Sequence, residues 1–273
     1  MLEQLCLIRQ QIKENNPLIH CLTNHITIND CANALLAVGA RPIMAEHPLE
    51  VEQITSGASA LSVNLGNIND KRMQSMLLSG QQASRQNIPC ILDLVGVGCS
   101  DLRLNFARKF IEQCRPGVIK GNISEVRALL SGTQVSGVDV SAQDKQLTLQ
   151  EVIDIARQAA QKYKAIFLLS GKVDVIADKN VVYLVDNGHF FLSLITGTGC
   201  VLNVLCAAFM SGGSIFKGVL AATIFFSVCG EVAATQAKGP TSFKTNLFDS
   251  LYNLSDETFC QRAKIKEVTH EKN

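Results

Sequence analysis

Apolar residues along the chain follow two alternating patterns. Short apolar runs of two to five residues predict buried strands, and the longer segments between them have apolar residues at every third or fourth position, which predicts amphipathic helices. In the segment 149–163, for example, Val152, Ile155 and Ala159 share one helical face. The predicted strands are 18–22, 42–45, 61–65, 90–94, 118–119 and 165–169. The predicted helices between them are 2–15, 27–38, one that begins at Pro48, 70–86, one that ends near Cys114, 124–130 and 149–163.

Strands that alternate with helices of this length predict an α/β fold, with a mostly parallel sheet and helices on both faces. One exception is expected near 173–186, where apolar segments 173–177 and 181–185 flank Asp178-Lys179-Asn180 and predict a hairpin. Segments 201–210 and 216–237 are apolar almost all round and predict two neighbouring core helices. A helix at 243–254 is the last expected element.

Two polar segments are expected to lie outside the core. Residues 132–146 read as an exposed, irregular connection, and 255–273 read as an appended or loose tail. The chain shows no internal repeat and no linker, so we expect one domain that spans 1–273.

Composition narrows the function classes. The chain has 273 residues, a net charge of +1, no tryptophan and 5% aromatic residues, which argues against a nucleic-acid-binding protein. The ten cysteines are scattered through apolar runs without a Cys-x-x-Cys pair, as is typical of reduced core residues in a cytoplasmic protein. No signal peptide is expected, and the apolar run 218–230 is shorter than the roughly 20 residues of a membrane span.

The clearest chemical motif is Ile-Thr-Gly-Thr-Gly-Cys at 195–200, directly before an apolar helix. Gly197 and Gly199 allow the backbone to approach an anion at the helix N-terminus, where N–H groups lack partners and the helix dipole is positive. The same field is expected to lower the pKa of the Cys200 thiol. A phosphate cradle with a base inside it suits phosphoryl transfer to an alcohol. The alternative is a tight turn that lets the helix pack, with Cys200 as a small buried apolar residue.

Each predicted strand of the parallel sheet ends in polar or glycine residues. In parallel sheets ligands bind beyond the carboxyl ends of the strands, so these residues are expected to line one cleft. They are Thr23-Asn24, Met44-Ala45-Glu46, Asn64-Leu65-Gly66, Asp93, Lys120-Gly121-Asn122 and Ser170-Gly171.

Taken together, eight segments resemble the hydroxyethylthiazole kinase family, a ribokinase-like family of thiamine salvage. The segments are 17–24, 32–45, 60–66, 91–98, 118–125, 170–178, 186–189 and 196–200. The resemblance implies ATP-dependent phosphorylation of the hydroxyethyl group of 4-methyl-5-(2-hydroxyethyl)thiazole, with Mg²⁺ as the divalent cation. It also implies a homotrimer with active sites at the subunit borders.

The resemblance assigns substrate-binding and catalytic residues one by one. Met44 and Asn24 match positions beside the thiazole, and Gly197 matches a substrate-binding glycine. Cys200 matches the cysteine that stands where related sugar and vitamin kinases have an aspartate base, with Gly199 beside it in the anion hole. Met44 as a plain core residue and Asn24 as a turn residue are the structural alternatives.

The nucleotide and metal positions are assigned in the same way. Lys120 and Ser170 match positions that contact ATP, and Asp93 and Glu125, together with Asn122, match positions near the metal ion and the phosphates. The alternatives are that Asp93 caps a turn and that Glu125 only stabilises a helix N-terminus.

The chain departs from the usual family pattern at several positions. Leu94 stands where proline is usual, Lys120 where arginine is usual and Ser170 where threonine is usual; Arg41 and Asn67 are further departures. Lysine pairs with a phosphate as a point charge, without the planar fork of arginine.

Three alternatives stay open: a sister kinase of the same fold that acts on hydroxymethylpyrimidine or another small alcohol, an ADP-forming hydro-lyase of the same fold, and a catalytically silent binder, which the departures at Leu94, Lys120 and Ser170 keep open. Cys200 argues against the sister kinase and the hydro-lyase. A dinucleotide fingerprint and a Walker A motif are both missing from the sequence.

Overall fold

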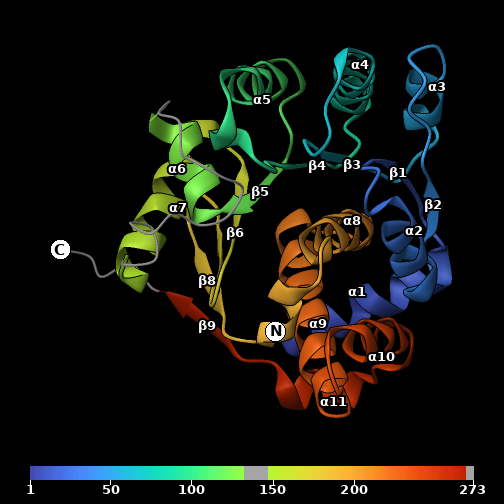
Figure 1. The fold of residues 1–273 in the computed structure, drawn as a ribbon, viewed down its shortest axis with the longest axis vertical. Helices are drawn as coiled ribbons and strands as arrows, with labels where there is room; N and C mark the ends of the chain where they lie inside the picture. Colours follow the sequence, from blue (N-terminus) through green and yellow to red (C-terminus); the bar gives the residue numbers. More distant parts are fainter. Residues whose placement is uncertain (132–146, 269–273) are drawn as a thin grey trace.

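The computed structural model describes residues 1–131 and 147–268. Within them, nine strands form one sheet in the order β2-β1-β3-β4-β5-β6-β7-β8-β9 (Figure 1). The strands are β1 (Leu18–Leu22), β2 (Arg41–Ile43), β3 (Ala60–Asn64), β4 (Cys90–Asp93), β5 (Val118–Asn122), β6 (Ile166–Ser170), β7 (Asp174–Ala177), β8 (Val182–Val185) and β9 (Ile265–Val268). Neighbours from β2 to β6 pair in parallel, whereas β6 to β9 pair antiparallel. The predicted parallel sheet and the predicted β7–β8 hairpin are confirmed.

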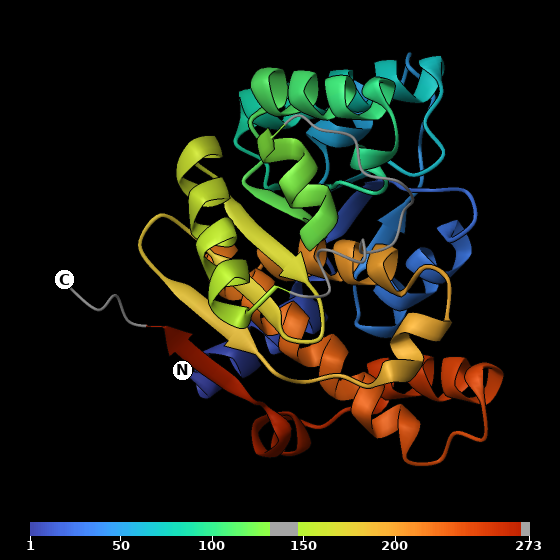
Figure 2. The same ribbon diagram turned by 60° about the vertical axis from the view of Figure 1, so that its left-hand side comes forward.

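Helices cover both faces of the sheet, as predicted (Figures 1 and 2). One layer contains α3 (Val51–Ser56), α4 (Asp70–Gln86), α5 (Asp101–Cys114), α6 (Ile123–Ser131) and α7 (Leu149–Tyr163). The other contains α1 (Leu2–Asn15), α2 (Ile28–Ala37), α8 (Thr198–Met210), α9 (Ile215–Ala234) and α10 (Pro240–Asn253). Strand side chains alternate between two hydrophobic cores: Ile19 and Ile91 belong to the core on the α8 side, whereas Leu22 and Leu92 belong to the opposite core.

Helix α8 is the centre of the core on its side of the sheet. Every residue from Cys200 to Met210 is buried, which explains why the sequence pattern is apolar all round. Helix α9 packs against it so closely that a Cβ on Gly218 would lie 2.6 Å from the carbonyl oxygen of Phe209. A glycine is therefore required at this crossing.

The apolar run at 218–230 lies within α9, in the place of the helix predicted over 216–237. Helix α9 has 20 residues, long and apolar enough by length and composition to cross a membrane, but 72% of its apolar window is buried inside the protein. The neighbouring helices α8 and α10 pack against α9 and cover much of its apolar surface.

Two predicted boundaries are corrected. Residues 48–50 form a turn, and α3 begins only at Val51. Strand β5 continues beyond Ile119 to Asn122, because its ladder with β6 extends to the pair Asn122 and Ser170. Lys120 and Asn122 therefore lie on a strand and not in a loop.

The expectation of a loose tail is wrong for residues 255–268. Helix α11 (Asp256–Arg262) begins at Ser255, whose side chain accepts a hydrogen bond from the Thr258 N–H, and Phe259 is fully buried. Strand β9 then pairs with β8 at the edge of the sheet. This pairing joins segments about 80 positions apart, which a local pattern does not reveal. The predicted connection at 132–146 lies outside the described residues.

Candidate active site

Three neighbouring strands bring a row of polar side chains to the carboxyl edge of the sheet. Asn64 ends β3, Asp93 ends β4 and Lys120 lies on β5; the register pairs Asn64 with Asp93 and Asp93 with Lys120. All three are buried: Asn64 is 0%, Asp93 2% and Lys120 3% exposed. Burying a charged group at this depth costs free energy unless the group is paired. The three side chains therefore form a preorganised polar site.

Asp93 and Lys120 form a buried ion pair. The Lys120 ammonium lies 3.1 Å from both carboxylate oxygens of Asp93, and the Asn64 amide donates to one of these oxygens at 3.0 Å. Burial raises the pKa of Asp93, and Lys120 and Asn64 oppose that rise. Burial lowers the pKa of Lys120, but the charge and hydrogen bond of Asp93 together with the charges of Cys200 and Glu125 outweigh it, and the pKa of Lys120 is raised.

Cys200 lies beside this pair in the first turn of α8. Its sulfur accepts hydrogen bonds from the Asn64 amide at 3.4 Å and from the Asn24 amide at 3.8 Å. Burial raises the pKa of the Cys200 thiol, Asp93 raises it further, and Thr27, Lys120 and Asn64 only partly offset these effects. The predicted lowering of this pKa is therefore wrong, because the desolvation of the thiolate outweighs the field of the helix N-terminus.

The glycine turn sets the position of this helix N-terminus. Gly197 caps α8 with a φ of +96°, and a Cβ at this position would lie 2.3 Å from the Thr27 methyl group. A Cβ on Gly199 would lie 3.5 Å from the Lys120 ammonium nitrogen. The turn thus brings the unpaired N–H groups of α8 against the row of polar side chains, as the motif predicts.

Substituting alanine for Gly197 tests this close contact. Gly197→Ala is expected to lower the melting temperature and kcat/KM, because the new methyl group meets Thr27 and a positive φ costs about 1–3 kcal/mol for a residue with a side chain. Gly213→Ala is the matched control, since Gly213 has a φ of +136° but no atom within 4 Å of an added Cβ. Equal activity and equal melting temperatures for the two variants would contradict the role of the Thr27 contact.

A cavity of about 810 Å³ opens on the other side of Gly199. Ser170, Thr198 and Gly199 line it together with Phe226 and Ser227 of α9. Its remaining lining comes from Leu202 of α8, the turn after β6 with Asp174 of β7, the segment after β8, and Lys264 next to β9. Its volume lies in the range of roughly 300–1,000 Å³ that is typical of small-molecule sites. The structure therefore brings Ser170 and Gly199 to one cavity.

Glu125 and Asn122 form a second polar group at the start of α6. The Glu125 carboxylate accepts the N–H groups of Gly96 and Asn122, each at 2.8 Å, and the Asn122 side chain accepts the Glu125 N–H at 2.9 Å. Burial and the nearby charge of Asp93 raise the pKa of Glu125 to about 7. Asn122 pairs with Ser170 across the β5–β6 ladder, so the two predicted nucleotide positions are neighbours.

Asp93 and Glu125 are the carboxylates of the site that could bind a metal ion. Among residues 1–131 and 147–268, no group of three or more His, Cys, Asp or Glu side chains is placed to hold a metal. Mg²⁺ commonly binds through one or two carboxylates together with substrate phosphates. Two buried carboxylates whose charges influence each other fit an ion that enters with a nucleotide better than a resident ion.

The remaining predicted substrate residue, Met44, follows β2 and is partly buried against the core on the α8 side. The carbonyl of the next residue, Ala45, lies 2.8 Å from a ring nitrogen of His20, whose pKa is lowered by burial. The sequence predicts Asn64 to line the cleft but gives it no specific role in binding or catalysis. Its contact with Cys200 arises only when β3 and α8 pack.

Asp174 is a buried carboxyl at the rim of the cavity, and no role was predicted for it. Its carboxylate accepts the Gly171 N–H at 2.9 Å, and burial raises its pKa from 3.8 to about 7. A group whose pKa is raised in the folded state adds stability at pH values below its unfolded pKa. That stability is lost as the pH rises through the folded pKa.

The raised pKa of Asp174 can be tested by measuring protein stability as a function of pH. The free energy of unfolding of the wild-type protein is expected to fall between about pH 4 and pH 7 relative to Asp174→Asn, by at most about 4 kcal/mol. Urea unfolding across this range is the measurement. Asp154→Asn removes a carboxylate that is 60% exposed and controls for the loss of one charge. A constant difference between wild type and Asp174→Asn would contradict the assignment.

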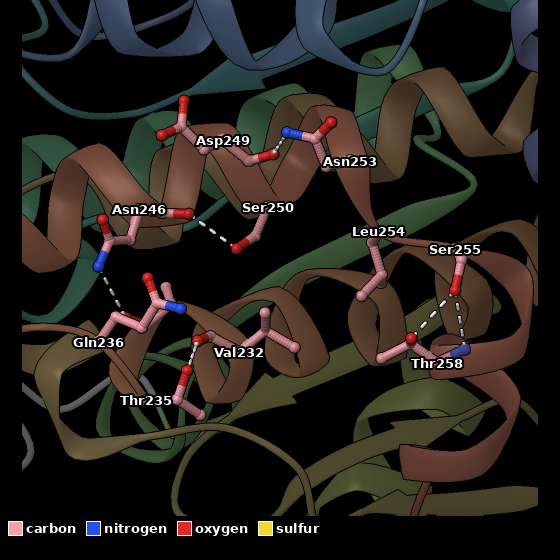
Figure 3. Close-up of a pocket in the computed structure, with 11 residues that line it drawn as sticks. Val232, Thr235, Gln236, Asn246, Asp249, Ser250, Asn253, Leu254, Ser255 and Thr258 are labelled. Carbon is pink, nitrogen blue, oxygen red and sulfur yellow. Dashed lines mark hydrogen bonds between the residues drawn. The ribbon is translucent and has the colours of Figure 1, made fainter.

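A second pocket of about 300 Å³ lies where α9, α10 and α11 meet (Figure 3). Its polar groups bond locally: the Asn246 amide donates to the Ala233 carbonyl at 3.2 Å, and the Ser250 hydroxyl donates to the Asn246 carbonyl at 2.7 Å. Asp249 is the charged residue among the described lining residues, so this pocket offers no cation to a phosphate.

Comparison with known proteins shows the family of this chain. The model of the hydroxyethylthiazole kinase family matches residues 9–257. The chain belongs to the hydroxyethylthiazole kinase family. It is 44% identical over 261 residues to hydroxyethylthiazole kinase 2 of Clostridium botulinum strain Langeland, which covers 94% of this chain and 98% of that relative. It is 41% identical over 260 residues to hydroxyethylthiazole kinase of Clostridium tetani, which covers 93% of this chain and 94% of that relative.

Solved structures support the same assignment. A hydroxyethylthiazole kinase structure from Pyrococcus horikoshii has a TM-score of 0.90 and 30% identity, and covers 98% of this chain and 100% of that one. A ribokinase-like protein from Enterococcus faecalis shares the fold at 13% identity and a TM-score of 0.65, with 90% and 93% of the two chains covered. The predicted family, the ribokinase-like fold and the enzyme class, a phosphotransferase that phosphorylates hydroxyethylthiazole, are thereby confirmed. A kinase of this family takes a small alcohol and ATP as substrates.

Proposed function

We propose that this enzyme transfers the γ-phosphoryl group of ATP to the hydroxyethyl group of 4-methyl-5-(2-hydroxyethyl)thiazole, with Cys200 as the base. The observation that carries the proposal is the position of the α8 N-terminus. Cys200 faces the amides of Asn24 and Asn64 on one side, and the adjacent Gly199 lines the large cavity on the other. An alcohol on the amide side and a triphosphate on the cavity side would meet at this turn.

On the alcohol side, Asn24, Met44 and Gly197 contact the thiazole. The proposal for Asn24 is supported by its amide, which points at Cys200 and could also meet a hydroxyl group there. The proposal for Met44 is supported by its place at the end of β2, the strand next to the one that leads to Asn24.

On the nucleotide side, Ser170 and Asn122 contact ATP, and Lys120 directs its charge toward the phosphates. The N–H groups from Gly197 to Cys200 form the anion hole that holds charge on the transferring group. Asp93 and Glu125 would hold Mg²⁺. When bound, this ion supplies positive charge to the phosphate oxygens.

Cys200 accepts the proton of the alcohol as the phosphoryl group crosses. The raised pKa means that the thiol form dominates in the resting enzyme and that the thiolate becomes more abundant as the pH rises. Lys120, Thr27 and Asn64 favour the thiolate over the thiol. A general base of this kind contributes roughly 10²–10⁴-fold to a rate.

We further propose a cytoplasmic homotrimer in which subunit contacts complete the site. The support is a set of exposed apolar side chains in the segments that surround it: Ile26 is 68%, Leu49 91% and Phe190 64% exposed. Apolar side chains of this size are typically covered in an assembly. Light scattering coupled to size-exclusion chromatography measures the assembly; a monomer would contradict this part of the proposal.

An assay of Mg²⁺-dependent ATP consumption tests the reaction. The enzyme is supplied with 4-methyl-5-(2-hydroxyethyl)thiazole, with hydroxymethylpyrimidine, or with no alcohol. We expect ATP turnover with the thiazole, and none with the pyrimidine or without an alcohol. Turnover with the pyrimidine would instead identify a sister kinase, and thiazole binding without turnover would identify a silent binder.

A further inference from the structure

Arg72 is a buried cation near the site for which neither the sequence motif nor the proposed mechanism provides a role. It lies in the first turn of α4, whose start is capped by Asn69, and is 2% exposed. One terminal nitrogen of its guanidinium donates to the carbonyls of Gly66 and Asn67, each at 2.8 Å, and the other donates to the Thr23 carbonyl.

The remaining guanidinium nitrogen, Nε, faces a carboxylate on another segment. It lies 3.5 Å from Glu46, which also lies 3.0 Å from a ring nitrogen of His25. Burial lowers the pKa of Arg72, and Glu46 opposes that effect. A buried cation is costly, so the carbonyls and the carboxylate around it must be held in place for it to be tolerated.

The partners of Arg72 come from three different segments that follow strands. Thr23 follows β1, Glu46 follows β2, and Gly66 and Asn67 follow β3. The fork of an arginine donates to the carbonyls of two of these segments and places its charge 3.5 Å from the carboxylate of the third, whereas a lysine offers a single point charge. Arg72 therefore ties together three loops that share no backbone ladder at these positions.

Each of these loops carries a residue of the alcohol side of the site. Asn24 directly follows Thr23, Met44 lies two residues before Glu46, and Asn64 lies two residues before Gly66. The loops touch, since a Cβ on Gly66 would lie 2.8 Å from the Asn24 amide. A shift of any one loop would therefore move the amides that face Cys200.

We propose that Arg72 is a positioning residue for the alcohol substrate: its guanidinium holds the three segments in register, so that Asn24 and Asn64 keep their places beside Cys200 and Met44 keeps its place after β2. This inference rests on the proposed function, because it assigns the alcohol to that side of the site. Arg72 does not touch the cavity that we assign to ATP.

The test compares Arg72→Lys with Arg9→Lys in the full-length protein. Arg9 is a matched control: it is 7% exposed, donates to the Leu254 carbonyl and pairs with Asp256, but joins α1 to Leu254 and the first residue of α11. We expect both variants to melt at lower temperature. Only Arg72→Lys should raise the KM for the thiazole alcohol, by roughly tenfold, while the KM for ATP changes by less than about twofold.

Hydrogen exchange adds a measurement that needs no substrate. The peptides that contain 23–27, 44–47 and 64–69 should exchange faster in Arg72→Lys than in Arg9→Lys. Should Arg72→Lys fail to fold, Glu46→Gln replaces it, because Glu46 is 42% exposed; we expect it to raise the KM for the alcohol by roughly twofold to threefold.

Two results have different meanings. If the wild-type enzyme phosphorylates no thiazole alcohol, the proposed function fails. If the wild-type enzyme is active and Arg72→Lys loses stability like Arg9→Lys with an unchanged KM for the alcohol and unchanged loop exchange, Arg72 has only a structural role and the inference is overturned.

Discussion

Replacing Cys200 with alanine is expected to lower kcat by roughly 100-fold or more, with little change in the KM for ATP. Alanine leaves the helix N-terminus and its N–H groups in place but cannot accept the proton of the alcohol. Single-turnover measurements with the thiazole alcohol and ATP separate the chemical step from binding. Cys206→Ala is the matched control, because it removes a thiol from the same buried helix two turns closer to its end.

The pH dependence of kcat/KM also tests Cys200 as the base. A base works in its deprotonated form, so a raised thiol pKa should place the rising limb of the wild-type profile on the alkaline side. Cys200→Asp should retain activity and reach its plateau at lower pH, since a carboxyl is more acidic than a thiol even when buried. Normal turnover of Cys200→Ala would show that Cys200 only packs the helix.

Replacing Lys120 with methionine is expected to destabilise the protein by about 3–5 kcal/mol and to abolish most of its activity. The change leaves the Asp93 carboxylate, 2% exposed, without its cation at 3.1 Å, so that Asp93 must either remain as an uncompensated charge or take up a proton. Urea unfolding near pH 7 measures the loss of stability. The loss should shrink at lower pH, where Asp93 becomes neutral.

Two further variants isolate the role of the charge. Lys120→Met combined with Asp93→Asn should recover much of the stability, because both charges of the buried pair are removed together, but should not recover activity. Lys244→Met removes the cation of an ion pair with Asp30 at 2.7 Å, in which the lysine is 43% exposed, and should cost less than about 1 kcal/mol. A fully stable Lys120→Met protein would contradict the importance of the buried pair.

Local patterns were sufficient where the physical cause is local. The hairpin of β7 and β8 follows from two short apolar segments around a polar turn, and α7 follows from one apolar face and a Thr148 cap. The burial of α8 on every side could be predicted for the same reason, because a helix that is apolar all round has no face that favours water.

Contacts between segments that are distant in the sequence could not be predicted from local patterns. Strand β9 owes its existence to the exposed edge of β8, and Lys120 lies on β5 because the ladder with β6 continues past Ile119. Arg72 looks like an ordinary charged position in a helix until three loops converge on its guanidinium.

The sequence by itself determined the alternation of strands and helices, the glycine turn before a buried helix, and the family to which the chain belongs. Each of these depends on the order of residue types along the chain. The tertiary structure alone decided which side chains meet Cys200 and what form its thiol takes. The helix N-terminus acts over one turn and could be foreseen, but the loss of water around the sulfur depends on how β3, β4 and α8 pack, and that loss is the larger effect on the pKa of Cys200.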